Sequence, residues 1–65
     1  MKKTKLGDLK EGDFFKFVDE IEYFPTIVHT FKSSEGKECT YFSEVGGYVL
    51  TNKEKRGRLV LKVKG

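Results

Sequence analysis

Residues 23–51 read YFPTIVHTFKSSEGKECTYFSEVGGYVLT, and two glycine-containing turns divide this stretch into strand-like segments. The first turn spans residues 33–37, where Gly36 can adopt a positive φ and close a hairpin. The second turn is Gly46-Gly47. On either side of the turns, β-branched and aromatic residues alternate with polar ones, which is typical of strands. The predicted strands of this antiparallel meander are residues 23–32, 38–44 and 48–51.

Two further strand patterns flank the meander. Residues 14–18 place Phe15 and Phe17 on one face, because alternate side chains of a strand point the same way. Residues 58–63 alternate most regularly, and we expect their apolar side chains at odd positions to face the core while Val60 faces outward. The predicted core consists of Phe15, Phe17, Phe31, Phe42, Leu59, Leu61 and Val63.

Short strands separated by turns about every 8–12 residues predict an all-β fold. We expect a small five-stranded antiparallel barrel, closed or nearly closed, since closure removes exposed strand edges. An oligonucleotide-binding-type barrel is the alternative, although that fold usually needs more residues and a helix between strands. Residues 1–65 are expected to form one domain, in which residues 1–5 are a basic flexible arm.

The approach to the first strand carries a resemblance. Residues 6–17 read LGDLKEGDFFKF, with two leucines three positions apart, a glycine before the strand and alternating aromatics. This phrase resembles the start of small phage and prophage proteins of the Src-homology-3-like barrel type, which commonly begin Leu-x-Asp-Leu-Lys-x-Gly-Asp-x-Phe-x-Phe. The resemblance implies a Src-homology-3-like barrel and a phage-encoded protein. It implies no activity and no functional residue, because such barrels host many binding functions.

The cysteine and histidine content excludes several kinds of site. One cysteine cannot form an internal disulfide, and one cysteine with one histidine cannot supply the about four ligands of a zinc site. His29 and Cys39 lie on neighbouring predicted strands, but no third group or oxyanion site accompanies them. We expect a non-enzymatic protein with no metal and no cofactor, in which Cys39 packs as a small hydrophobe and His29 lies on the surface of a sheet.

No segment has the pattern of a membrane span or a secretory signal. The basic residues 1–5 are followed by residues 6–11, which are too polar for the apolar part of a signal peptide. No apolar run approaches the roughly 18 residues of a membrane span. Together with the lone cysteine, this pattern predicts a cytoplasmic protein without membrane contact.

Charge is segregated along the chain. Residues 1–5 hold three lysines, residues 6–52 hold nine acids and four lysines, and residues 53–64 hold six cations and one acid. The formal net charge is +3. Patches of opposite sign favour binding over catalysis, because charge steers association without supplying chemistry.

The first binding hypothesis is a protein partner. Acidic loops flank the first predicted strand, and nine aromatic residues are more than a core of this size is expected to bury. We expect a phage-encoded interaction or inhibitor protein that docks a host protein through these loops and exposed aromatics. The candidate partner-binding residues are Tyr23, Phe24, Tyr48, Asp19, Glu20 and Glu22.

The alternative hypothesis is a nucleic-acid-binding small barrel. A basic turn continued by outward cations on the last strand predicts a stripe that follows a phosphate backbone. Exposed aromatics would supply stacking platforms for bases. The candidate nucleic-acid-binding residues are Lys53, Lys55, Arg56, Arg58, Lys62 and Lys64.

Overall fold

In the part of the chain that the structure describes, six strands form one antiparallel sheet, in the order β1-β6-β2-β3-β4-β5. A computed structural model describes residues 3–23 and 27–63. The only helical segment in these residues is a single 3₁₀ turn, η1. The elements are β1 (Lys3–Lys5), η1 (Leu6–Asp8), β2 (Phe14–Phe17), β3 (His29–Glu35), β4 (Glu38–Val45), β5 (Tyr48–Lys55) and β6 (Leu59–Val63).

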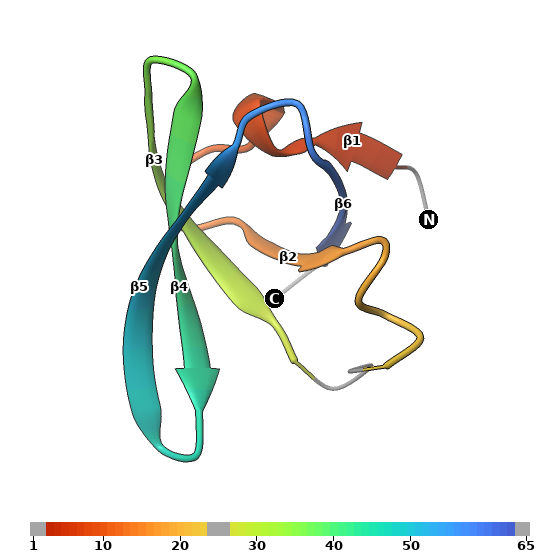
Figure 1. Cartoon of the computed structure of the whole chain (residues 1–65), viewed down its shortest axis with the longest axis vertical. Coiled ribbons are helices and arrows are strands. Elements are labelled where there is room, and N and C mark those ends of the chain that lie inside the picture. Colours follow the sequence, from red (N-terminus) through yellow and green to blue (C-terminus); the bar gives the residue numbers. More distant parts are fainter. Residues whose placement is uncertain (1–2, 24–26, 64–65) are drawn as a thin grey trace.

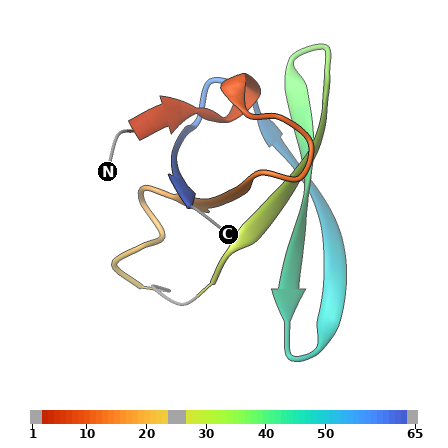
Figure 2. The ribbon, with the colours of Figure 1, turned by 180° about the vertical axis from the view of Figure 1, so that it is seen from behind.

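The predicted all-β class is confirmed, but the sheet is not closed as a barrel. It has six strands instead of the expected five, and β1 and β5 form its two edges. The sheet is strongly bent, so that β1, β6 and β2 lie across from the long hairpins of β3, β4 and β5 (Figure 1 and, from behind, Figure 2). The helix expected of an oligonucleotide-binding-type barrel does not occur among the described residues.

Backbone hydrogen bonds hold the open sheet in its bent form. The Leu6 N–H donates to the Arg58 carbonyl at 2.8 Å, and the Gly7 N–H donates to the Arg56 carbonyl at 2.9 Å. The Arg56 N–H donates in turn to the Lys37 carbonyl at 3.1 Å. Glycine suits position 7, because a Cβ there would lie only 2.9 Å from the Cβ of Arg56. The turn between β5 and β6 thus bridges η1 and the β3–β4 turn.

Glycine turns set the two long hairpins, as the sequence predicts. Gly46 and Gly47 have φ of 59° and 85°, and a two-residue turn of this kind requires positive φ at both positions. Gly36, in the β3–β4 turn, has φ of 59°. The strands that flank these turns differ from prediction in length, since β3 begins only at His29 and β5 continues to Lys55.

Two other segments also differ from the predicted conformation. Residues 3–5, expected to belong to a flexible arm, form β1 and pair with β6. The segment after β2 forms successive turns that continue to Tyr23, where the second strand was expected to begin. In these turns the Glu20 N–H donates to the Phe17 carbonyl and the Tyr23 N–H donates to the Glu20 carbonyl, each at 3.1 Å. A polar run without alternation satisfies its backbone locally in this way.

The core lies between the two halves of the bent sheet. Phe15 and Phe17 are buried, as predicted, and their rings meet edge to face with centroids 5.3 Å apart. Phe42, also predicted in the core, is only half-buried, and the Lys32 Nζ lies 5.3 Å from the centroid of its ring. Burying one large apolar side chain stabilises a fold by about 1.5–3 kcal/mol. The other members of the core are Leu6, Leu9, Phe31, Cys39 and Val60, with Tyr41 packed against them.

The face of β6 is the reverse of the predicted one. Val60 is fully buried, whereas Leu59 is 48% exposed. The ladder between β2 and β6 pairs Val60 with Phe17, so the two side chains share the core face. Leu61 and Val63 are half-buried on the opposite face. Both faces of this strand carry apolar residues, and alternation alone does not fix which of them packs inward.

Candidate functional site

Arg58 belongs to an ion-pair network within the fold. Its guanidinium donates to both carboxylate oxygens of Asp19, at 2.9 and 3.0 Å, and also to Glu54. The guanidinium lies over the ring of Phe17, 4.2 Å from the centroid. Burial acts to lower the pKa of Arg58, but the hydrogen bonds to Asp19 and Glu54 hold it above its ordinary value. Arg58 is therefore engaged within the fold and does not project as a phosphate contact.

The other cations of the predicted nucleic-acid stripe differ in their contacts within the fold. Val60 and Lys62 are alternate residues of β6, so the Lys62 side chain points to the same side of the sheet as the buried Val60. The Lys62 Nζ lies 3.6 Å from the Asp13 carboxylate. Arg56 donates to the hydroxyl of Ser34. The remaining members are Lys53 and Lys55, which are exposed on β5, and Lys64, which lies outside the described residues.

The acidic loop after β2 is partly turned toward the fold. Asp19 carries the ion pair described above, and Glu20 Oε1 lies 3.2 Å from Nε2 of His29. These two carboxylates therefore make contacts within the fold, and their role as docking groups stays a prediction. The predicted docking residues of this loop that stay exposed are Asp19, Glu22 and Tyr23, while Glu20 is half-buried and Phe24 lies outside the described residues.

A buried polar chain that the sequence pattern did not reveal runs through His29. The imidazole is 6% exposed, so the prediction of a surface histidine is wrong. Its Nδ1 lies 2.7 Å from Ser43 Oγ, and Asn52 Nδ2 donates to the same oxygen at 3.3 Å. With the proton on Nε2, the imidazole donates to Glu20 and accepts from Ser43. Each hydrogen bond among these side chains then has one donor and one acceptor.

The His29 chain holds the interior of the fold together. Its sequence of hydroxyl, imidazole and carboxylate has the order of a hydrolytic triad. However, Ser43 is only 7% exposed and lies opposite His29 in the β3–β4 ladder. Three aromatic rings surround the imidazole with centroids 5.1–5.4 Å away. Cys39, the other nucleophile candidate, is buried and pairs with Ser34 rather than with His29.

The clearest exposed feature is the apolar end of the β4–β5 hairpin. The turn end of this hairpin extends away from η1 and from the rest of the sheet (Figure 1), and its apolar side chains are exposed. Single exposed apolar residues are common, whereas a contiguous patch marks an interaction surface. The residues of the patch, called the hairpin end below, are 50–76% exposed and comprise Val45, Tyr48, Val49 and Leu50.

Three of the four side chains share one side of the hairpin. The β4–β5 ladder pairs Val45 with Tyr48 and Ser43 with Leu50. Directly opposed residues point to the same side, and alternate residues along a strand do so too. Val45, Tyr48 and Leu50 therefore lie on the side of the buried Ser43, and Val49 lies on the other. Most of the hairpin end therefore lies on the core side of the sheet, at positions where the side chains are exposed instead of buried.

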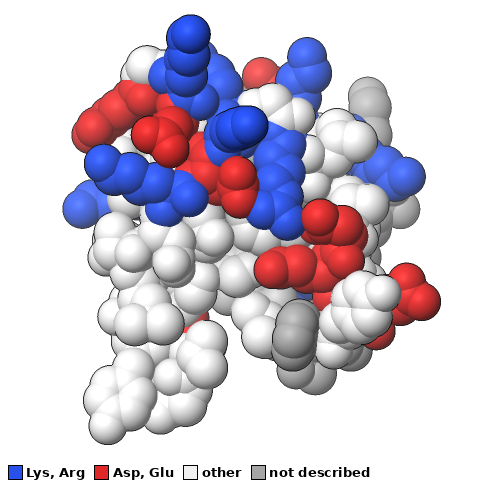
Figure 3. Space-filling model, in the orientation of Figure 1, with Lys and Arg blue, Asp and Glu red and all other residues white. Residues whose placement is uncertain are grey.

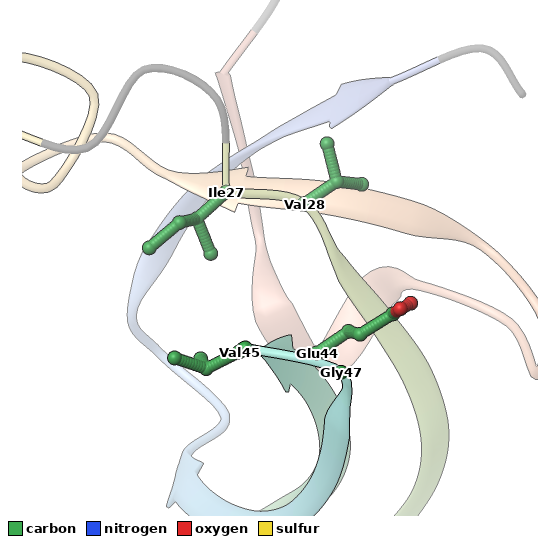
Figure 4. A pocket seen from close by; sticks show the side chains of 6 residues that line it. Ile27, Val28, Glu44, Val45 and Gly47 are labelled. Carbon is green, nitrogen blue, oxygen red and sulfur yellow. The ribbon is translucent and has the colours of Figure 1, made fainter.

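A hollow of about 440 Å³ lies beside the hairpin end. Ile27 and Val28, from the segment before β3, border it on one side, and Glu44, Val45 and the Gly46-Gly47 turn border it on the other (Figure 4). Its walls are mixed: Ile27, Val28 and Val45 are apolar, and Glu44 supplies a carboxylate at the border. The hollow connects the hairpin end with the segment before β3.

The hairpin end is also set apart by charge. No charged residue occurs between positions 45 and 52. In the space-filling view, acidic and basic side chains gather over the other end of the hairpin and over the loop side, while the lower part of the hairpin carries almost none (Figure 3). An uncharged apolar surface is less costly to remove from water than a charged one.

Comparison with known proteins gives no relative. No protein-family model matches the chain, and neither a curated protein nor a solved structure matches it. Residues 3–23 and 27–63 include no group of three or more His, Cys, Asp or Glu side chains placed to hold a metal ion. They also include no helix long and apolar enough to cross a membrane. The function of the hairpin end therefore rests on its own geometry.

Proposed function

We propose that the chain is a non-enzymatic binding module that docks a protein partner through the hairpin end. The observation that carries this proposal is the gathering of four exposed apolar side chains within eight consecutive uncharged residues. Removing such side chains from water in an interface contributes about 25 cal/mol per Å² of apolar area. Tyr48, 76% exposed and aromatic, has the character of an interface hot spot.

The chemistry of the surface indicates the chemistry of the partner. The hollow accepts an apolar side chain between Ile27 and Val45, and Glu44 at its border can pair with a cation. The fitting partner surface is therefore apolar with a lysine or arginine at its rim. Of the predicted docking residues, Tyr48 lies at the centre of this proposal.

Substitution at the hairpin end tests the proposal. The wild-type chain is immobilised and exposed to a nuclease-treated lysate of its source cells, beside Tyr48→Ser and Leu50→Ser variants. A partner that docks at the hairpin end is captured by wild type and lost with both variants. The matched control is Leu59→Ser, because Leu59 is also half-exposed but lies on β6. Equal capture by all four chains, at unchanged melting temperatures, overturns the proposal.

Nucleic-acid contact is the competing proposal. The exposed Lys53 and Lys55 support it, although Arg58 and Lys62 are held in ion pairs within the fold. Labelled single- and double-stranded DNA and RNA are titrated at about 50 and 200 mM salt, since phosphate contacts weaken steeply with ionic strength. Micromolar binding that falls by orders of magnitude and is lost in Lys53→Gln/Lys55→Gln replaces the protein-partner proposal. Absence of binding at low salt removes the competitor.

We also propose that the sheet is an opened relative of the Src-homology-3-like barrel. The short strands, the strong bend and the bridge from η1 to the β5–β6 turn support this relationship. Origin in a phage and location in the cytoplasm stay predictions from the sequence. A solution structure with distances between β1 and β5 typical of paired strands would strengthen the barrel assignment.

A further inference from the structure

The outer edge of β5 is open. β5 is the last strand in the sheet order, and no strand in the described part of the chain pairs with the side away from β4. All four residues from 48 to 51 are exposed. Edge strands are normally protected by charges, prolines or bulges, because their unpaired backbone groups accept further strands. Residues 48–52 have neither a charge nor a proline.

The ladder register shows which backbone groups point out of this edge. Val45 lies opposite Tyr48, and in the same register the Arg56 N–H donates to the Lys37 carbonyl. The backbone groups of even-numbered β5 residues therefore face β4, because facing and outward residues alternate in an antiparallel pair. The odd-numbered residues direct their N–H and C=O groups outward. They are Val49, Thr51, Lys53 and Lys55.

One of these outward donors is already occupied. The N–H of Lys55 donates to the Oε1 of Glu54 at 3.0 Å, which confirms that it does not face β4. The outward set available for pairing is reduced to three residues at alternate positions. They are Val49, Thr51 and Lys53, with Thr51 in the middle.

We propose that a second copy of this chain pairs with β5 along this edge, antiparallel and about a two-fold axis at Thr51. An antiparallel two-fold places Thr51 opposite Thr51 of the second copy and Val49 opposite Lys53 of the second copy. Every outward residue then meets another outward residue, and each pair exchanges both of its backbone hydrogen bonds. A two-fold at Val49 would instead oppose Thr51 to Gly47, which lies in the turn.

Charge complementarity supports this register. On the outer side of the sheet, Glu44 lies opposite Val49 within one chain. In the proposed pairing, Lys53 lies opposite Val49 of the second copy. Glu44 of that copy lies on the next strand, two strand spacings from Lys53. Strands are about 4.8 Å apart, so extended lysine and glutamate side chains span the two steps. The same contact forms twice because the axis is two-fold.

Pairing at the edge leaves Tyr48 and Leu50 of the proposed docking surface free, whereas Val49 of the hairpin end and Glu44 at the border of the hollow take part in both proposals. The contacts use outward backbone groups and the outer side of β5, whereas Tyr48 and Leu50 lie on the opposite side of the strand. The inference therefore goes beyond the proposed function and does not depend on it. A dimer of this kind would present two hairpin ends at once and bind a repeated partner with increased avidity.

The oligomeric state in solution tests the inference. Sedimentation equilibrium and light scattering are measured from about 1 µM to 1 mM chain, with wild type expected to pass from 7.5 kDa toward twice that mass. Thr51→Pro removes the central outward N–H without removing a bond to β4, because proline is tolerated at an edge where the N–H faces solvent. It should raise the dimer dissociation constant by at least about tenfold, since two central hydrogen bonds are lost. Thr51→Val keeps the N–H and should keep the dimer.

A charge exchange tests the register separately, in case the proline variant does not fold. Lys53→Glu places two glutamates together and should weaken the dimer, and the double variant Lys53→Glu/Glu44→Lys should restore it. Lys37→Glu makes the same charge change at the β3–β4 turn and should have no effect. A monomer at every concentration overturns the inference and leaves the edge to a strand of another protein. A dimer that is insensitive to Thr51→Pro, or not restored by the exchange, overturns it as well.

Discussion

The guanidinium of Arg58 lies 4.2 Å from the centroid of the Phe17 ring, so that a charged side chain covers one end of the aromatic core. Asp19 and Glu54 hold it there from two different elements, one in the loop after β2 and one in β5. A residue with the sequence pattern of a surface cation is therefore part of the structural framework. Arginine suits this place because its planar group stacks and donates several hydrogen bonds at once.

Removing this arginine should destabilise the fold. Arg58→Gln loses the contact with Phe17 and both ion pairs, and we expect the free energy of unfolding to fall by about 1–2 kcal/mol. Denaturant unfolding followed by circular dichroism measures it. Arg56→Gln is the matched control, because Arg56 lies in the same turn and makes a side-chain hydrogen bond only to Ser34. Equal losses in the two variants would show that the Phe17 contact contributes little.

Acid should weaken the fold partly through Glu54. The hydrogen bond from the Lys55 N–H, with further contributions from Arg58, lowers the pKa of Glu54 below its ordinary value of 4.5. The unfolded chain then binds this proton at higher pH than the folded chain, so stability present above 4.5 is lost as the pH falls through the folded pKa. Unfolding free energies from pH 7 to 3 should decline less in Glu54→Gln than in wild type. Parallel curves would contradict this assignment.

The hydrogen bond between Ser43 and His29 should matter more than the charge of Glu20. Ser43→Ala leaves the buried Nδ1 without its partner, and we expect a loss of about 1–3 kcal/mol in the free energy of unfolding. Glu20→Gln keeps an acceptor oxygen for Nε2 at a position that is partly exposed, so we expect a change below about 0.5 kcal/mol. Both follow from denaturant unfolding at pH 7. A larger effect of Glu20→Gln than of Ser43→Ala would contradict this ranking.

Substitutions can test which side of β6 packs into the core. Val60→Ala removes two methyl groups from the core and should cost about 1–3 kcal/mol, because the cavity that remains is only partly filled. Leu59→Ala removes more atoms but from a half-exposed side chain, and should cost less than about 1 kcal/mol. Thermal melting of both variants measures the order. A larger loss for Leu59→Ala than for Val60→Ala would indicate that Leu59 faces the core, as the alternation pattern predicted.

The sequence predicted those parts of the fold that depend on local chemistry. The positive-φ glycines at 36, 46 and 47 mark the hairpin turns, and Phe15 and Phe17 alternate on a strand whose other face holds the more exposed Phe14 and Lys16. The face of β6 was not predictable in this way, because it depends on insertion between β1 and β2. β1 itself was missed because three residues with two lysines carry no strand pattern of their own.

The site was predicted only in part for a similar reason. Tyr48 was identifiable because aromatic residues exceeded the capacity of a small core. The engagement of Asp19 and Glu20 was not, since their partners Arg58 and His29 are 39 and nine residues away in the chain. Long-range pairs of this kind follow from the bend of the sheet, and no local pattern encodes them.

The pairing of Val60 with Phe17 has a consequence for biosynthesis. The β3–β4–β5 meander contains only neighbouring strands, so it can begin to form while the chain is still being made. Phe17, by contrast, has its ladder partner 43 residues further along, in β6. In the nascent chain, Phe17 can contact β3 and β4 early, but its β6 side stays uncovered until β6 emerges from the ribosome. Transient protection by a chaperone is therefore most valuable during synthesis of the β4–β5 hairpin.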